Sequence, residues 1–212
     1  MIITLTGFMG CGKSSVGRCL SELLCCPFMD LDTVIEETQR RSIPDIFTTD
    51  GEAAFRLMEV EALSRIIEAQ QLRDKKQSLP LQATGPSLCG QRGSTVSYPS
   101  TTWTANNDKV VVALGGGAVM TPECAELVRK KTHCIYLRAT VDTLVSHLEH
   151  ESAGRPMLQG TSLRTRIEEL MSLRSATYEA IAHDVIDTDG KTIEEIAAEI
   201  NSREYRRVRE DL

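Results

Sequence analysis

Eight residues near the start of the chain, from Gly7 to Ser14, restrict its fold more than any other segment. They read Gly-Phe-Met-Gly-Cys-Gly-Lys-Ser and match the pattern GxxxxGK[ST], whose glycines let backbone N–H groups turn toward phosphate oxygens. The apolar run 2–6 before them reads as a buried strand, and the residues 13–24 after them have the apolar spacing of a helix. Strand, loop and helix in this order predict a phosphate-binding turn that faces the positive end of the helix.

The same motif assigns roles to its last residues. Lys13 is expected to reach the β- and γ-phosphates of a nucleoside triphosphate, and the hydroxyl of Ser14 is expected to bind Mg²⁺. An ordinary glycine-rich turn is the alternative, and the flanking strand and helix weigh against it. The residues predicted to hold the nucleotide are Gly10, Cys11, Gly12, Lys13, Ser14 and Ser15.

Short apolar runs alternate with helical patterns along the rest of the chain. Because these runs are apolar throughout, they predict a parallel sheet covered by helices on both faces, an α/β fold in which ligands bind at the carboxyl ends of the strands. The residues 201–212 are highly charged and are expected to fray. Strands are predicted at 2–6, 26–30, 109–114, 133–137 and 185–187, and helices include 13–24, 32–41, 43–49, 51–72, 141–150, 163–182 and 192–200.

A single domain, 1–212, fits the length of the chain. The segment 73–108 does not fit a compact domain, because it is rich in Ser, Thr, Gly, Pro and Gln, and structureless connections that long are uncommon. We interpret it as an inserted surface excursion that either touches the substrate region or projects away. Val96, Tyr98 and Trp103 could anchor it as a small hairpin.

Two carboxylates, Asp30 and Asp32, follow the predicted strand 26–30 and are expected to point into the crevice beside the phosphate loop. One of them can bind the metal, and the other can bind the hydroxyl of an acceptor. A helix cap for Asp32 and a solvated turn for Asp30 remain the alternatives. The strand 109–114 carries no acid at its end and is followed by the run Gly115, Gly116 and Gly117. Such a run indicates a close approach of the backbone to another group, or else a flexible turn.

Three arginines are candidates for binding an anionic group. Arg56 lies on the predicted helix 51–72 near Glu52 and Glu59, where an exposed ion pair is the alternative. Arg155 lies in a loop after a helix, where a lid at about 150–162 is expected. Arg174 lies within the long helix 163–182, where a solvated charge is the alternative.

The composition excludes several classes of protein. A net charge of −6 argues against a nucleic-acid partner. No apolar run approaches the roughly 20 residues that span a bilayer, and the first residues lack the basic leader of a signal peptide. The seven cysteines are expected to be free thiols in a reducing cytosol. The chain contains no NKxD sequence, the motif by which GTPases read guanine. A compact cytoplasmic kinase therefore remains. It is expected to be a monomer without membrane contact.

Six segments, taken in order, resemble those of shikimate kinases: GFMGCGKSSVGRCL, MDLD, SIPDIFTTDGEAAFRLME, ALGGGAVMTPE, GRPML and LRSATY. The resemblance implies a three-layer P-loop kinase fold with a five-stranded parallel sheet and a lid. It also implies transfer of phosphate from ATP, with Mg²⁺, to the 3-hydroxyl of shikimate in aromatic amino-acid biosynthesis.

The resemblance also implies a role for each matching residue. Lys13, Asp32 and Arg155 would be catalytic, and Arg155 would contact ATP as well. Ser14 and Asp30 would bind the metal. The shikimate site would comprise Asp32, Arg56, Gly115, Gly116, Gly117 and Arg174. Because a free Asp has a pKa near about 4, the orienting role of Asp32 is expected to matter more than its role as a base.

Two features depart from the family pattern. The excursion 73–108 is longer than the usual connection. The residues 145–148, Val-Ser-His-Leu, lack the arginine that often stacks on adenine. The turn 188–191 is expected to pass near adenine, with no contacts assigned to it. Another small-metabolite kinase, such as a gluconate kinase, and a non-catalytic nucleotide-binding module remain as rival functions.

Overall fold

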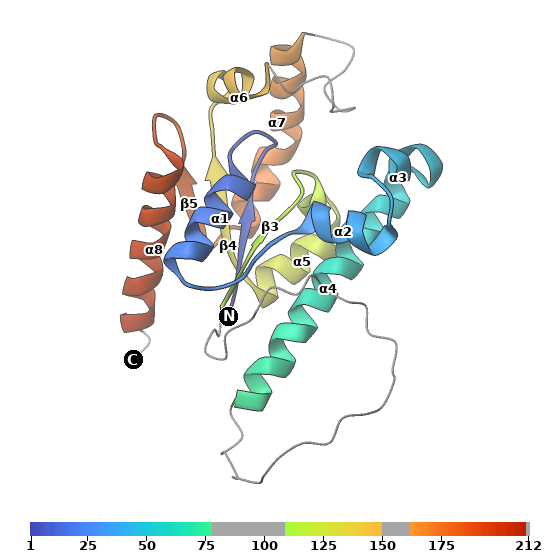
Figure 1. Cartoon of the computed structure of the whole chain (residues 1–212). Helices are drawn as coiled ribbons and strands as arrows, with labels where there is room; N and C mark the ends of the chain where they lie inside the picture. Colours follow the sequence, from blue (N-terminus) through green and yellow to red (C-terminus); the bar gives the residue numbers. More distant parts are fainter. Residues whose placement is uncertain (78–108, 150–161, 211–212) are drawn as a thin grey trace, which may run out of the picture.

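The computed structural model describes residues 1–77, 109–149 and 162–210. Five parallel strands form one sheet in the order β2-β3-β1-β4-β5 (Figure 1). The α/β fold with a five-stranded parallel sheet is therefore confirmed. The strands are β1 (Ile2–Thr6), β2 (Phe28–Asp30), β3 (Val110–Ala113), β4 (His133–Arg138) and β5 (Asp184–Asp187).

Helices cover both faces of the sheet, as the apolar strands predict (Figure 1). The side chains of Ile2 and Ile3 on β1 enter different hydrophobic clusters, because successive residues of a strand point to opposite faces. The helices are α1 (Lys13–Leu23), α2 (Leu31–Gln39), α3 (Ile43–Thr49), α4 (Gly51–Gln77), the 3-10 helix η1 (Ala118–Met120), α5 (Pro122–Lys131), α6 (Val141–Leu148), α7 (Leu163–Ile181) and α8 (Ile193–Glu210).

The two clusters place different helices on the two faces. One face holds Leu31 of α2, Leu63 of α4 and Val128 of α5. The other holds Leu20 of α1 and the apolar residues of α6 and α8. The strands meet their neighbours in parallel register, with Ile3 opposite Val111 and His133. All five strands therefore end at one edge of the sheet, where the loops that follow them gather.

Most predicted boundaries agree within two residues, but two helices extend much further than predicted. Helix α4 continues to Gln77 instead of ending at Leu72, so the first residues of the expected excursion are helical. Helix α8 continues to Glu210, although 201–212 were expected to fray. The hairpin around Val96, Tyr98 and Trp103 lies outside the described residues, as does the expected lid up to residue 161.

The last turns of α8 are ordered because they pack on β4. Glu204 is 2% exposed and its Oε1 lies 3.1 Å from the Nε2 of His133. The side chain of Arg207 contacts the other ring nitrogen of that histidine. Burial lowers the pKa of His133 to about 4, and the charge of Arg207 acts in the same direction. The ring is thus neutral at pH 7 and links β4 to the C-terminal helix.

Among the helices that the structure describes, none is both long enough and apolar enough to cross a membrane.

Candidate active site

The phosphate loop lies between β1 and α1, as predicted. Gly10 and Gly12 have φ angles of 82° and 91°, in the left-handed region that glycine adopts without strain. A methyl group on Gly10 would also lie only 2.9 Å from the side chain of Leu148, so glycine fits this position for two reasons. Gly12 precedes α1 directly, and the positive end of that helix therefore faces the loop.

The ammonium group of Lys13 lies over the loop that precedes it. Its Nζ donates hydrogen bonds to the carbonyl oxygens of Gly7 at 3.0 Å and Phe8 at 2.9 Å. The thiol of Cys11 is 3.9 Å from the same nitrogen. These contacts hold the positive charge at the loop, where a bound phosphate would meet it.

Ser14 and Asp30 are in direct contact, 2.5 Å apart between the hydroxyl and the carboxylate Oδ2. The other oxygen of Asp30 accepts a hydrogen bond from the backbone N–H of Asp32 at 3.1 Å and caps α2. The cap is therefore Asp30, and the alternative that Asp32 is the cap is wrong. A hydroxyl and a carboxylate side by side are the hard oxygen ligands that suit Mg²⁺.

A cavity of about 780 Å³ opens at this edge of the sheet, within the usual size of a small-molecule site. Ser15 and Leu114 line it together with the residues just described. The glycine run enters it through Gly115 and Gly116. The predicted residues that the cavity brings together are Gly10, Cys11, Gly12, Lys13, Ser14, Ser15, Asp30, Asp32, Gly115 and Gly116.

Gly115 allows two carboxylates to approach the backbone. A methyl group on it would lie 2.8 Å from the Oδ1 of Asp32 and 2.8 Å from the Oε1 of Glu59. Both oxygens are buried and have no hydrogen-bond partner among the described residues. The glycine run is thus a close approach, as the sequence indicates, and the flexible-turn alternative is wrong.

The surroundings of Asp32 and Glu59 raise the pKa of both carboxyl groups. Burial raises the pKa of Asp32 to about 6, and the charge of Asp30 acts in the same direction. Burial also raises the pKa of Glu59 to about 7, although Arg56 opposes the shift. Both carboxyl groups therefore titrate near neutral pH, unlike a free Asp or Glu.

Arg56 lies beside the third glycine of the run. A methyl group on Gly117 would lie 2.5 Å from its guanidinium. Its two terminal nitrogens contact Glu59 at 2.7 Å and Glu52 at 2.8 Å. Because its side chain is 17% exposed and that of Glu59 only 1%, the alternative of an exposed surface ion pair is wrong. In the sequence Glu59 stands out only as a neighbour of Arg56 at i+3, and its place in the site is not evident from that pattern.

Arg174 reaches the same glycine run from α7. It is 7% exposed, and its guanidinium lies 3.4 Å from the carbonyl oxygen of Gly116 and 6.0 Å from the ring centre of Phe8. The hydroxyl of Tyr178, one turn further along α7, donates to the same carbonyl. The alternative of a solvated helix charge is therefore wrong, and Tyr178 is a contact that the sequence pattern did not reveal.

The far end of the cavity is built from α6, from the turn before α8 and from the first turn of α8. Sequence analysis expected the turn 188–191 there without assigning contacts. The Nδ1 of His147 lies 2.8 Å from the carbonyl oxygen of Gly10. This histidine occupies the segment in which the family's usual arginine is missing. The lining residues are His147, Thr188, Lys191, Thr192, Ile193, Glu194 and Ile196.

Arg155 lies outside the described residues, so its predicted place in the site stays a prediction.

A family model described as "Shikimate kinase" matches residues 9–72 and 101–203 of the chain. The chain belongs to the shikimate kinase family. The model leaves 73–100 unmatched, a stretch that falls within the excursion expected from the sequence. Membership decides against the gluconate kinase alternative.

Individual shikimate kinases agree over nearly the whole length. The shikimate kinase of Thermus thermophilus is 32% identical over 204 residues, which cover 96% of this chain and 90% of that protein. The one from Dictyoglomus turgidum is 33% identical over 203 residues, covering 95% of both. A solved shikimate kinase from Acinetobacter baumannii in complex with shikimate is 26% identical, with a TM-score of 0.74, and the match covers 97% of this chain and 93% of that one.

Proposed function

We propose that the protein transfers the γ-phosphoryl group of ATP to the 3-hydroxyl of shikimate. One observation carries the proposal: the phosphate loop with Lys13 and the carboxylate of Asp32 line the same cavity, in a chain of the shikimate kinase family. Kinases need the donor phosphate and the acceptor hydroxyl within reach of each other, because phosphoryl transfer depends on positioning and charge stabilisation.

In this proposal the loop residues from Gly10 to Ser15 bind the phosphates of ATP, and the turn before α8 receives the base. Ser14 and Asp30 would hold Mg²⁺, which would supply positive charge beside the phosphates. Among the described residues there is no cluster of three or more His, Cys, Asp or Glu able to hold a metal. Since Mg²⁺ in kinase sites is usually held by one or two protein carboxylates together with the substrate, it would bind along with the nucleotide.

Shikimate would lie against the glycine run at the other end of the cavity. Its carboxylate suits the guanidinium groups of Arg56 and Arg174, because the planar fork of arginine matches the two oxygens of a carboxylate. Both guanidinium groups lie beside this run, at Gly117 and at Gly116. The Oδ1 of Asp32, which no described residue contacts through a hydrogen bond, could accept one from a ring hydroxyl.

Asp32 would orient the acceptor hydroxyl and take its proton. Its pKa of about 6 makes it a better general base at neutral pH than a free Asp, so the role in proton transfer is larger than sequence reasoning expected. Lys13 would stabilise charge on the transferring group. Arg155, carried over from the family's Gly-Arg-Pro motif, is proposed to share that role.

We expect activity to fall on the acid side of neutrality. Catalysis needs Asp32 ionised, and its raised pKa of about 6 means that the protonated form accumulates below that pH. The ratio kcat/KM for shikimate should therefore fall about tenfold for each pH unit below about 6, which forms the acid limb of the profile. The measurement is a pH–rate profile from 5 to 9. Glu61→Gln, on an exposed side chain of α4, should keep the limb, and a flat wild-type profile down to pH 5 would contradict the assignment.

Replacing Arg56 with alanine is expected to raise the KM for shikimate by about 10- to 100-fold, because a charge-assisted bidentate contact is lost. The KM for ATP should change little. Arg65→Ala is the matched control, since Arg65 lies on the same helix and its side chain is 42% exposed in a pair with Glu61. An unchanged shikimate KM in Arg56→Ala would refute the carboxylate assignment.

A substrate panel tests the function itself. ADP release is measured with shikimate, quinate, gluconate, AMP and no acceptor, with and without Mg²⁺. The proposal expects rapid ADP release with shikimate and Mg²⁺ only, and phosphorus NMR of the product should place the new phosphate on the 3-oxygen. Equal ADP release without any acceptor would favour a simple ATPase, and no release at all would favour a nucleotide-binding module.

A further inference from the structure

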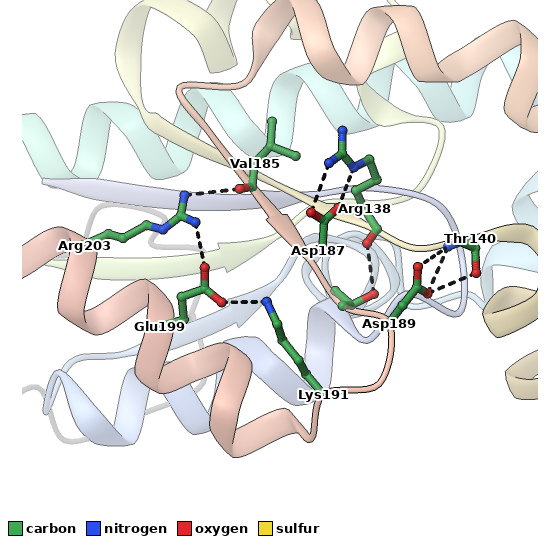
Figure 2. Close-up of polar contacts among 9 residues, drawn as sticks. Arg138, Thr140, Val185, Asp187, Asp189, Lys191, Glu199 and Arg203 are labelled. Atoms are coloured by element: carbon green, nitrogen blue, oxygen red, sulfur yellow. Dashed lines mark hydrogen bonds and ion pairs between the residues drawn. The ribbon is translucent and has the colours of Figure 1, made fainter.

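The turn between β5 and α8 is bound to the start of α6 through Asp189 (Figure 2). The carboxylate oxygens of Asp189 accept hydrogen bonds from the backbone N–H of Thr140 at 3.1 and 3.2 Å. The hydroxyl of Thr140 lies a further 3.1 Å from Oδ1. Thr140 is the N-cap of α6, so a carboxylate from a distant part of the chain lies at the positive end of this helix.

The charge of Asp189 is secured by these contacts. Burial raises its pKa, but hydrogen bonds from Thr143 and Thr140 outweigh burial and bring the pKa below its ordinary value. The carboxylate is therefore ionised throughout the neutral range.

The last turn of α6 is bound to the phosphate loop. His147 contacts the carbonyl oxygen of Gly10 at 2.8 Å, and Leu148 packs so closely on Gly10 that only a glycine fits there. Thr140 and His147 are seven positions apart, about 10 Å along the helix axis. Helix α6 thus connects the turn before α8, through Asp189, with the phosphate loop, through His147.

The turn itself is a well-connected unit that faces the cavity. The N–H of Thr188 donates to the carbonyl of Arg138 at 2.9 Å, and the N–H of Lys191 donates to the carbonyl of Thr188 at 3.2 Å. The ammonium group of Lys191 contacts Glu199 of α8 at 2.7 Å (Figure 2). Both Thr188 and Lys191 line the cavity, so a shift of the turn would change the shape of the nucleotide site.

We propose that Asp189 is a positioning residue for the nucleotide: by fixing the turn 188–192 to the start of α6, it sets the spacing between that end of the cavity and the phosphate loop. The inference rests on the proposed function, because it assumes that ATP occupies this cavity. Asp189 acts through Thr140 and α6 and is not assigned a contact with the nucleotide.

Two simpler roles for Asp189 predict different results. A helix cap alone would affect thermal stability and leave nucleotide affinity unchanged. A purely electrostatic influence would have the opposite sign, because removing a negative charge near an anionic ligand strengthens its binding. The positioning role predicts weaker nucleotide binding.

The test compares Asp189→Asn with Asp187→Asn. The control removes the same charge two residues away, where Asp187 forms an exposed pair with Arg138 at 2.6 Å. We expect Asp189→Asn to raise the calorimetric Kd for ADP and the KM for ATP by about 5- to 10-fold, while the KM for shikimate stays within about twofold. The control should match the wild type in all three. Unchanged or tighter ADP binding by Asp189→Asn, or an equal rise in both KM values, would overturn the proposal.

A double variant tests the route through α6. If Asp189 and His147 act through the same helix, their effects on ADP affinity should not add. The double variant Asp189→Asn with His147→Ala should then have a Kd for ADP close to that of the single variant with the higher Kd. Effects that multiply would overturn this route. Should Asp189→Asn fail to fold, Thr140→Val removes the hydrogen bond from the Thr140 hydroxyl to the Oδ1 of Asp189 and should also raise the Kd.

The wild type separates the inference from the proposed function. A wild type that neither binds ADP nor consumes ATP with shikimate would refute the function, and the inference with it. An active wild type whose ADP affinity is unaffected by Asp189→Asn would refute the inference alone.

Discussion

Replacing Lys13 with alanine is expected to lower kcat by about 10³-fold, with a smaller effect on the KM for shikimate. Preorganised donors at a developing negative charge are worth about 10² to 10³ in kcat each, and Lys13 carries a full positive charge at the phosphate loop. Its Nζ lies within 3.0 Å of two loop carbonyls, so the cation is already in place before transfer begins.

Single-turnover measurements at saturating ATP and shikimate are the appropriate check, because they separate phosphoryl transfer from product release. Lys130→Ala serves as the control, since Lys130 lies on α5 with its side chain 55% exposed in a pair with Glu126. Circular dichroism should confirm that Lys13→Ala is folded. A folded variant that keeps more than about a tenth of wild-type kcat would exclude the proposed role for this lysine.

Asp32→Asn should lower kcat by about 10² to 10⁴, the usual contribution of a general base, and should at the same time stabilise the fold. The amide keeps the shape of the side chain but cannot take the proton. The stability gain follows from the raised pKa: the folded state prefers the protonated carboxyl, so the ionised form destabilises it as the pH rises from 3.8 through about 6.

The gain should therefore be largest above pH 6 and nearly absent at pH 4. The pKa shift corresponds to at most about 3 kcal/mol in the free energy of unfolding. Thermal unfolding at pH 4.5 and pH 8, together with kcat at pH 8, tests both parts. Glu126→Gln, an exposed site on α5, should change neither. An Asp32→Asn variant that is fully active, or less stable at pH 8 than the wild type, would contradict the assignment.

The sequence predicted the sheet well because each strand is a short apolar run beside a clear turn, as in β1 before Gly7. The end of α8 could not be predicted in the same way. Its residues, such as Glu204 and Arg207, look like a solvated charged tail in the sequence. Their partner, His133, lies about 70 positions earlier, and only the folded chain brings it to them.

In the site, too, contiguous segments could be predicted from the sequence, whereas contacts between distant residues could not. The phosphate loop is a continuous segment, so Lys13 and Ser14 could be assigned from the pattern alone. The surroundings of Arg56 and Arg174 could not, because an exposed and a buried arginine look alike in a sequence. Their surroundings depend on the glycine run after β3. The raised pKa of Glu59 depends mainly on its burial in the folded chain, and the charge of Asp32 acts in the same direction.

The direction of helix α4 determines where inserted sequence joins the fold. It runs from the edge of the sheet that holds the cavity toward the edge where the strands begin (Figure 1). Gln77 follows Arg56 by 21 positions, a distance of about 30 Å along the axis, and β3 starts at Val110 on that remote side. Extra sequence between α4 and β3 therefore enters the fold far from the guanidinium groups. The same junction is a suitable place to graft a reporter or affinity module while the catalytic machinery stays intact.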